Sequence, residues 1–206
     1  MIETLNNIDT QLFYFLNGLH CTGMDWVMWV FTARWSWLII IVAAYLLLTT
    51  RTFHLSPFTF HLEKHWWLVL LGIGLCFLLA DRGSVMLFKN TVCRERPCHT
   101  LENVHMFREG CGGLYGFISS HAANAFAIAF FFWKRYRRQT AKVLVSTIVP
   151  IAMIVWAFMT SYSRVYLGKH YPGDILCGAI FGVLVGWLVW WITKKIEELF
   201  QKNETK

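Results

Sequence analysis

The sequence predicts an all-α protein, a polytopic transmembrane helical bundle of five or six spans that follows an N-terminal interfacial helix. Three observations predict this class. Of the 206 residues, 56% are apolar and only 15% are charged, against about 25% charged residues in soluble domains. Several apolar runs approach the roughly 20 residues that cross a bilayer. The lysines and arginines gather between and after these runs.

Five apolar segments are predicted to cross the membrane. They are Trp35 to Thr49, Trp66 to Phe88, Ser120 to Trp133, Val143 to Thr160 and Ile175 to Thr193. The first could extend backward through residues 24–33, and small residues ahead of the third could lengthen it. Residues 1–206 are interpreted as a single integral membrane domain, because neither an internal repeat nor a low-complexity linker divides them.

Residues 1–31 are expected to form an interfacial N-terminal segment. Its stretch "IDTQLFYFLNGLH" mixes apolar residues at 12, 13, 15 and 16 with polar ones, the pattern of an amphipathic helix that lies on the membrane. A sixth crossing from Leu12 to Phe31 is the alternative. It would place Asn17, His20 and Asp25 in the hydrocarbon at a considerable cost.

The distribution of positive charge predicts the orientation. The segment "WKRYRRQTAK" lies between the third and fourth spans, and four lysines follow the fifth. By the positive-inside rule both segments are cytoplasmic. The N-terminus, residues 89–119 and residues 161–174 are then outside. Six cations break the usual bias there: Lys89, Arg94, Arg96, Arg108, Arg164 and Lys169. This exception indicates another task for them, although Lys169 is assigned only a surface role.

Three outside segments carry the candidate chemistry. "KNTVCRERP" holds Lys89 and Arg96, "ISSH" holds Ser119, Ser120 and His121, and "SYSRVYLGKHYPGD" holds Ser163, Arg164, His170 and Asp174. Each alone has an ordinary explanation: interfacial cations, a histidine in a helical core, or an acid that complements the dipole of the next helix. Their predicted position on one membrane face favours a shared site.

This inventory suits phosphoryl transfer. A phosphate carries up to two negative charges, which cations must neutralise in the transition state, and arginine can bind two phosphate oxygens. One histidine can attack phosphorus while a second protonates the leaving oxygen, and an adjacent acid fixes the attacking tautomer. Two-metal phosphatases need clustered carboxylates, but the outside acids are scattered: Glu95, Glu102, Glu109 and Asp174. We therefore expect no metal and no other cofactor.

The three segments together closely resemble the signature of the type 2 phosphatidic acid phosphatase superfamily. They read Lys89-x6-Arg96-Pro97, Ser119-Ser120-His121 and Ser163-Arg164-x5-His170-x3-Asp174. The family includes bacterial phosphatidylglycerophosphate, undecaprenyl diphosphate and lipid A phosphatases, and soluble vanadium haloperoxidases. The motif-bearing core covers residues 89–174. Ile118 and Ser120 replace the proline and glycine of the family's second motif, which is expected to modulate the site without abolishing it.

The resemblance implies a role for each motif residue. His170 would form a phosphohistidine, Asp174 would orient it, and His121 would protonate the leaving group. The phosphate oxygens would be held by Lys89, Arg96 and Arg164 with Ser119, Ser120 and Ser163. The chain would then be a metal-independent membrane lipid phosphatase acting on a phosphomonoester or diphosphate lipid. Undecaprenyl diphosphate is the first expectation; phosphatidylglycerophosphate, phosphatidate and lipid A phosphates are alternatives. A lipid-phosphate-binding transporter or flippase-like protein is the non-enzyme alternative.

The expected location is the bacterial cytoplasmic (inner) membrane, with the active site facing the periplasm or exterior. The expected partners are the lipid phosphate and the bilayer, and nucleic acid is set aside because no basic stripe lies on a polar fold. In an oxidising periplasm, Cys98 and Cys111 could form a disulfide, with Cys93 as a rival partner. The absence of a CxxC pair argues against a zinc site.

Overall fold

The computed structural model describes residues 2–54, 59–108, 110–137 and 143–204, and in them it confirms the predicted helical bundle. The α-helices are α1 (Ile2–Asn17), α2 (Thr22–Thr32), α3 (Arg34–Thr49), α4 (Trp66–Gly83), α5 (Asn90–Val92), α6 (Pro97–Thr100), α7 (Ser120–Tyr136), α8 (Val143–Tyr166) and α9 (Pro172–Glu204). A π-helical segment, η1 (Ser84–Lys89), continues α4.

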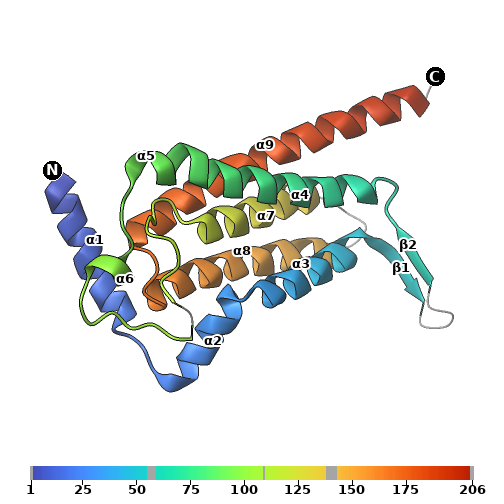
Figure 1. The fold of residues 1–206 in the computed structure, drawn as a ribbon. Helices are drawn as coiled ribbons and strands as arrows, with labels where there is room; N and C mark the ends of the chain where they lie inside the picture. Colours follow the sequence, from blue (N-terminus) through green and yellow to red (C-terminus); the bar gives the residue numbers. More distant parts are fainter. Residues whose placement is uncertain (1, 55–58, 109, 138–142, 205–206) are drawn as a thin grey trace.

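A short antiparallel hairpin joins α3 to α4. Its strands are β1 (Thr50–His54) and β2 (Thr59–Leu62), and Phe53 pairs with Phe60 in the register. Figure 1 shows the hairpin and the C-terminal end of α9 at one end of the bundle, and α1, α2 and α6 at the other.

Among the residues that the structure describes, three helical stretches are long and apolar enough to cross a membrane: Trp66–Val92, Leu144–Tyr166 and Pro172–Asn203. A fourth is formed if α2 and α3 are counted together, although the two helices bend by 63° at the break between them. The central helix α7, predicted as the third span, has only 17 residues and packs against α4, α8 and α9. The number of crossings therefore stays a prediction.

The N-terminal helix α1 has the predicted amphipathic character. Leu5, Ile8, Leu12 and Phe15 recur at helical spacing and are exposed, whereas Phe13 on another face is fully buried. The helix ends at residue 17, and α2 begins only at residue 22. The stretch from Leu12 to Phe31 is thus not one continuous helix, which disfavours the alternative of a sixth crossing made from it.

A stripe of glycines brings α9 against α7. Gly178, Gly182 and Gly186 lie four residues apart on one side of α9. A Cβ atom at Gly182 would lie 2.3 Å from the backbone oxygen of Ala123, and one at Gly186 would lie 2.4 Å from that of Ala127. Small residues at this spacing permit close helix contact in membranes. The contact places the first turns of α7 and α9, which carry two of the motifs, side by side.

We predict that Gly182→Ala loosens this contact and lowers stability by about 1–3 kcal/mol, the usual cost of overpacking. Gly74→Ala on α4 is the matched control, because a Cβ there meets nothing within 4 Å. Thermal unfolding of both variants in one detergent provides the measurement. Equal melting temperatures for the two would contradict the proposed contact.

Candidate active site

A pocket of about 630 Å³ opens between the helices at the end that carries the motifs. Six of the predicted site residues line it: Lys89, Arg96, Ser120, His121, Arg164 and His170. They come from η1, the loop before α6, α7, α8 and the α8–α9 connection. The structure therefore brings together residues from all three motifs.

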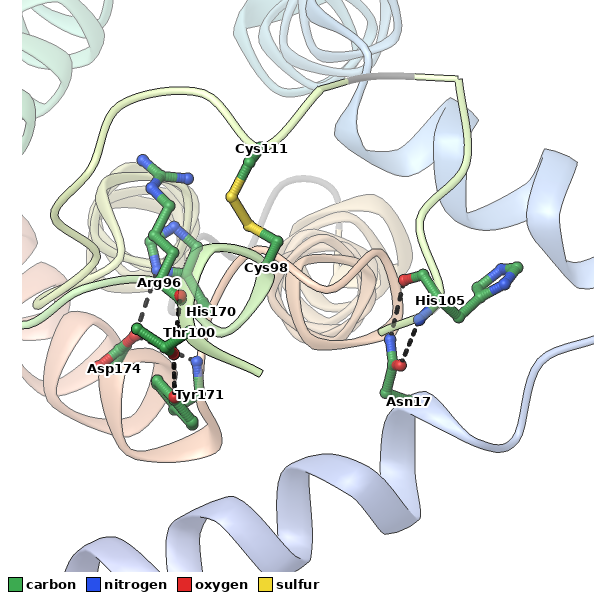
Figure 2. The surroundings of a disulfide bond; sticks show 9 residues. All are labelled: Asn17, Arg96, Cys98, Thr100, His105, Cys111, His170, Tyr171 and Asp174. Atoms are coloured by element: carbon green, nitrogen blue, oxygen red, sulfur yellow. Dashed lines mark hydrogen bonds and ion pairs between the residues drawn. A yellow bond between two sulfur atoms is a disulfide. The ribbon is translucent and has the colours of Figure 1, made fainter. Parts of the chain in front are cut away.

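His170 is held from one side by the acid four residues later. Its Nδ1 lies 3.4 Å from Oδ2 of Asp174, and the same oxygen accepts a hydrogen bond of 3.1 Å from the backbone N–H of Tyr171. Figure 2 shows these groups beside Arg96. Asp174 lies in the first turn of α9, following Pro172 at the helix start. Because Nδ1 is occupied, Nε2 is the nitrogen left for chemistry.

The surroundings of His170 favour its neutral form. Burial lowers the pKa of His170 well below its ordinary value, and the nearby charges of Arg96 and Arg164 act in the same direction. A neutral imidazole carries the lone pair that a nucleophile needs. At neutral pH His170 is therefore uncharged, with a lone pair on one ring nitrogen.

Gly116 lies against the His170–Asp174 pair. A Cβ atom at this position would lie 3.2 Å from Oδ2 of Asp174, 3.2 Å from Cγ of Arg96 and 3.4 Å from Nδ1 of His170. A side chain there would crowd all three groups.

Lys89 is the last residue of η1. Its Nζ donates a 2.9 Å hydrogen bond to Oγ of Ser120, and that oxygen shares a 2.6 Å hydrogen bond with Oγ of Ser84. π-Helical turns often occur at functional sites, because they shift the residues that follow. Ser120 replaces the family's glycine, and in this chain its hydroxyl holds Lys89.

Arg96 is positioned by a loop that folds back on itself. Its backbone N–H bonds to the carbonyl of Leu114 at 3.1 Å, and a disulfide joins Cys98 to Cys111 within the same loop. Figure 2 shows this disulfide between the His170–Asp174 pair and a second contact, Asn17 with His105. The rival Cys93 is free and exposed.

Arg164 and the second histidine come from helices of the bundle. Arg164 is 5% exposed, and its Nη1 donates to Oγ1 of Thr32 at the end of α2. His121 lies in the first turn of α7, with its ring edge-on to Trp37 at a centroid distance of 5.5 Å. Lys169 is only 4% exposed, so the surface role expected for it is wrong.

Two predicted phosphate ligands have other contacts. Ser119 is the N-cap of α7, and its Oγ accepts a hydrogen bond from the backbone N–H of Ala122. Ser163 donates a 2.6 Å hydrogen bond to the carbonyl of Thr160 within α8. Neither is among the residues that line the pocket. Helix capping and back-bonding are ordinary uses of a serine hydroxyl, which the motif pattern alone does not distinguish from ligand binding.

The sequence analysis missed three polar contributors. Ser84 binds Ser120, and Arg94 binds both Asp174 and Asp9. The predicted outside position of Arg94 could have indicated that it belongs to the site. Asp9 lies in α1, which the sequence analysis interpreted only as an interfacial segment. Within the described ranges, no group of three or more His, Cys, Asp or Glu side chains is placed to hold a metal ion. The expectation of metal-free chemistry stays a prediction.

The chain is similar in sequence to several known proteins. The profile of the PAP2 superfamily matches residues 65–198. The chain is 34% identical over 212 aligned residues to a lipid A 4'-phosphatase of Bacteroides thetaiotaomicron, covering 98% of this chain and 84% of that protein. It is 28% identical to a lipid A 4'-phosphatase of Porphyromonas gingivalis, covering 92% and 74%.

A solved structure shares the fold. The transmembrane PAP2-type phosphatidylglycerolphosphate phosphatase of Bacillus subtilis matches with a TM-score of 0.65 at 22% identity, covering 94% of this chain and 88% of that one. The family profile spans more than half of the chain and includes all three motifs. The chain therefore belongs to the PAP2 superfamily, and it is a membrane-embedded lipid phosphatase that hydrolyses phosphoric esters.

Proposed function

We propose that the protein removes phosphate from the sugar head group of a lipid A-type glycolipid, through a phosphohistidine formed at His170. The two relatives described above that align with most of the chain are both lipid A 4'-phosphatases. Their names support this substrate over undecaprenyl diphosphate, which was the first expectation from sequence. Undecaprenyl diphosphate, phosphatidylglycerophosphate and phosphatidate become the competing substrates of the test below.

The observation that carries the proposed chemistry is the placement of His170. Its Nδ1 faces Asp174, and it lines a pocket together with Lys89, Arg96 and Arg164. A phosphate in this pocket would meet three cations and an uncharged nitrogen nucleophile. Preorganised charge of this kind is generally the largest source of transition-state stabilisation.

The proposed reaction has two steps. The Nε2 lone pair of His170 attacks phosphorus, the N–P bond forms, and the bond from phosphorus to the sugar oxygen breaks. His121 delivers its proton to that leaving oxygen. Water then attacks phosphorus and gives a proton back to His121, the N–P bond breaks, and inorganic phosphate leaves. Throughout, Lys89, Arg96 and Arg164 neutralise the phosphate oxygens, and Asp174 stabilises the positive charge that develops on His170.

The pocket is suited to a substrate that approaches from the lipid phase. Leu38 of α3 and Phe77 of α4 both line it, and they are 67% and 50% exposed. Exposed apolar side chains on membrane helices face lipid, so the pocket wall continues onto the surface that acyl chains contact.

We place the site at the periplasmic face, because Lys194 and Lys195 lie toward the opposite end of α9.

We predict that His170→Ala abolishes turnover while the protein still folds, because no other nucleophile takes its place. Phosphate release and thermal unfolding in detergent provide the two measurements. His99→Ala is the control, since His99 is exposed in the neighbouring α6 and should retain wild-type activity. Substantial turnover by His170→Ala in folded protein would rule out the phosphohistidine.

We predict that His121→Ala has an effect that depends on the leaving group. A sugar alkoxide needs a proton as it departs, so the rate on the glycolipid should fall by about 10²–10⁴-fold. A nitrophenolate leaves without help, so the rate on an activated aryl phosphate should fall much less. Equal losses on both substrates would show that His121 is not the general acid.

A substrate panel tests the assignment of the lipid. Phosphate release is measured with lipid A, undecaprenyl diphosphate, phosphatidylglycerophosphate and phosphatidate, each with and without a metal chelator. We expect the highest kcat/KM for lipid A, with loss of the 4'-phosphate, and no effect of the chelator. A higher value for another lipid would reassign the substrate, and chelator-sensitive turnover would contradict metal-free chemistry.

A further inference from the structure

The carboxylate of Asp174 has a second partner beyond His170. Its Oδ1 accepts a 3.0 Å hydrogen bond from Nη1 of Arg94, while its Oδ2 faces His170 and the N–H of Tyr171. The side chain of Asp174 has no exposed surface. A buried carboxylate depends strongly on such partners, so the position and charge of Arg94 bear directly on the acid that orients His170.

The same nitrogen of Arg94 also binds an acid from the N-terminal helix. Nη1 lies 2.8 Å from Oδ2 of Asp9 in α1. An arginine Nη1 carries two hydrogens, so it can donate one to Asp9 and one to Asp174. Asp9, Arg94, Asp174 and His170 thereby form a continuous chain of charged and hydrogen-bonded groups. Its first member lies outside residues 65–198, which match the family profile.

Two further contacts fix the geometry of these four linked side chains. Oδ1 of Asp9 accepts a 2.8 Å hydrogen bond from the backbone N–H of Gly173 at the start of α9. The guanidinium carbon of Arg94 lies 3.9 Å from the ring centroid of Tyr171, a cation–π arrangement. Asp9 therefore contacts both the helix that carries Asp174 and the arginine that binds it.

We propose that Asp9 is a positioning residue of the catalytic site, which acts through Arg94 on Asp174 and through Asp174 on His170. This inference rests on the proposed roles of His170 and Asp174. Asp9 and Asp174 both interact with the guanidinium of Arg94, so Arg94 neutralises Asp174 only in part. The carboxylate of Asp174 therefore interacts more strongly with the imidazole of His170. In the absence of the Asp9 charge, Arg94 would interact with Asp174 alone, and the positive charge on His170 in the transition state would be less stabilised.

Other charged groups also surround His170, and they define the background for the test. They are Arg96 of the folded loop, Lys89 of η1, Arg164 of α8, His121 of α7, Lys169 of the α8–α9 connection and Asp174 of α9. None of these is changed in the variants below. Each variant therefore reports the effect of Asp9 or Arg94 against a constant set of neighbours.

Asp9→Asn separates charge from helix capping, because an asparagine oxygen can still accept the Gly173 hydrogen bond. We expect its kcat to fall on the order of tenfold with little change in KM, as misplacement of a reacting group does. The acid limb of its kcat/KM profile should move to lower pH, because one negative charge near His170 is lost. Arg94→Gln removes a positive charge instead, so its acid limb should move to higher pH.

The double variant and a distant control complete the experiment. Asp9→Asn with Arg94→Gln should lose less than the product of the single losses, because the two residues act along one chain. Asp25→Asn is the matched control, since Asp25 is a buried acid that binds His105 and Tyr166 outside the pocket. It should retain the wild-type pH profile.

Wild-type kcat and pH profile in Asp9→Asn would overturn the inference and leave Asp9 with helix capping only. Acid limbs that move in the same direction in both single variants would also overturn it. Either failure leaves the His170→Ala result unchanged. The inference and the proposed function are therefore tested separately.

Discussion

Asp174 has no exposed side-chain surface, and its carboxylate must therefore find its partners inside the protein. It finds them in separate segments of the chain: Arg94 of the loop before α6, and Tyr171 and His170 of the α8–α9 connection. A buried charge left without partners costs several kcal/mol, so these segments are constrained to meet at one point. The rest of the candidate site is arranged around that meeting point.

The close contact of α7 with α9 makes this meeting possible. Gly182 and Gly186 let the backbones approach further along the two helices, and at their first turns the N–H of Ser119 bonds to the carbonyl of Asp174 at 3.1 Å. The same turn of α7 carries His121 into the pocket. The glycine stripe takes no part in the chemistry. By holding α7 against α9 it fixes the position of His121, the proposed acid, relative to His170, the proposed nucleophile.

Much of the site could be predicted because motif spacing and apolar runs are local properties of a sequence. The long apolar runs predicted the bundle, and three short motifs predicted six of the residues that line the pocket. Ser119 and Ser163 lie outside the pocket lining and bind backbone groups, because a serine hydroxyl binds the nearest backbone group when one is available. Asp9 could not be found, because its contact with Arg94 spans 85 positions, and no local pattern encodes such a pairing.

The cations of the pocket serve two stages of the proposed reaction in opposite ways. Before substrate binds, Arg96 and Arg164 help to keep His170 neutral, because a proton on its ring would be repelled. When phosphate enters, its negative charges offset that repulsion, and the imidazole becomes more basic as it meets phosphorus. Positive charge developing on His170 then faces Asp174 on one side and the phosphate oxygens on the other. In the proposed reaction the substrate therefore completes the electrostatic balance of the site, and His170 reaches its full nucleophilic strength only when substrate is bound.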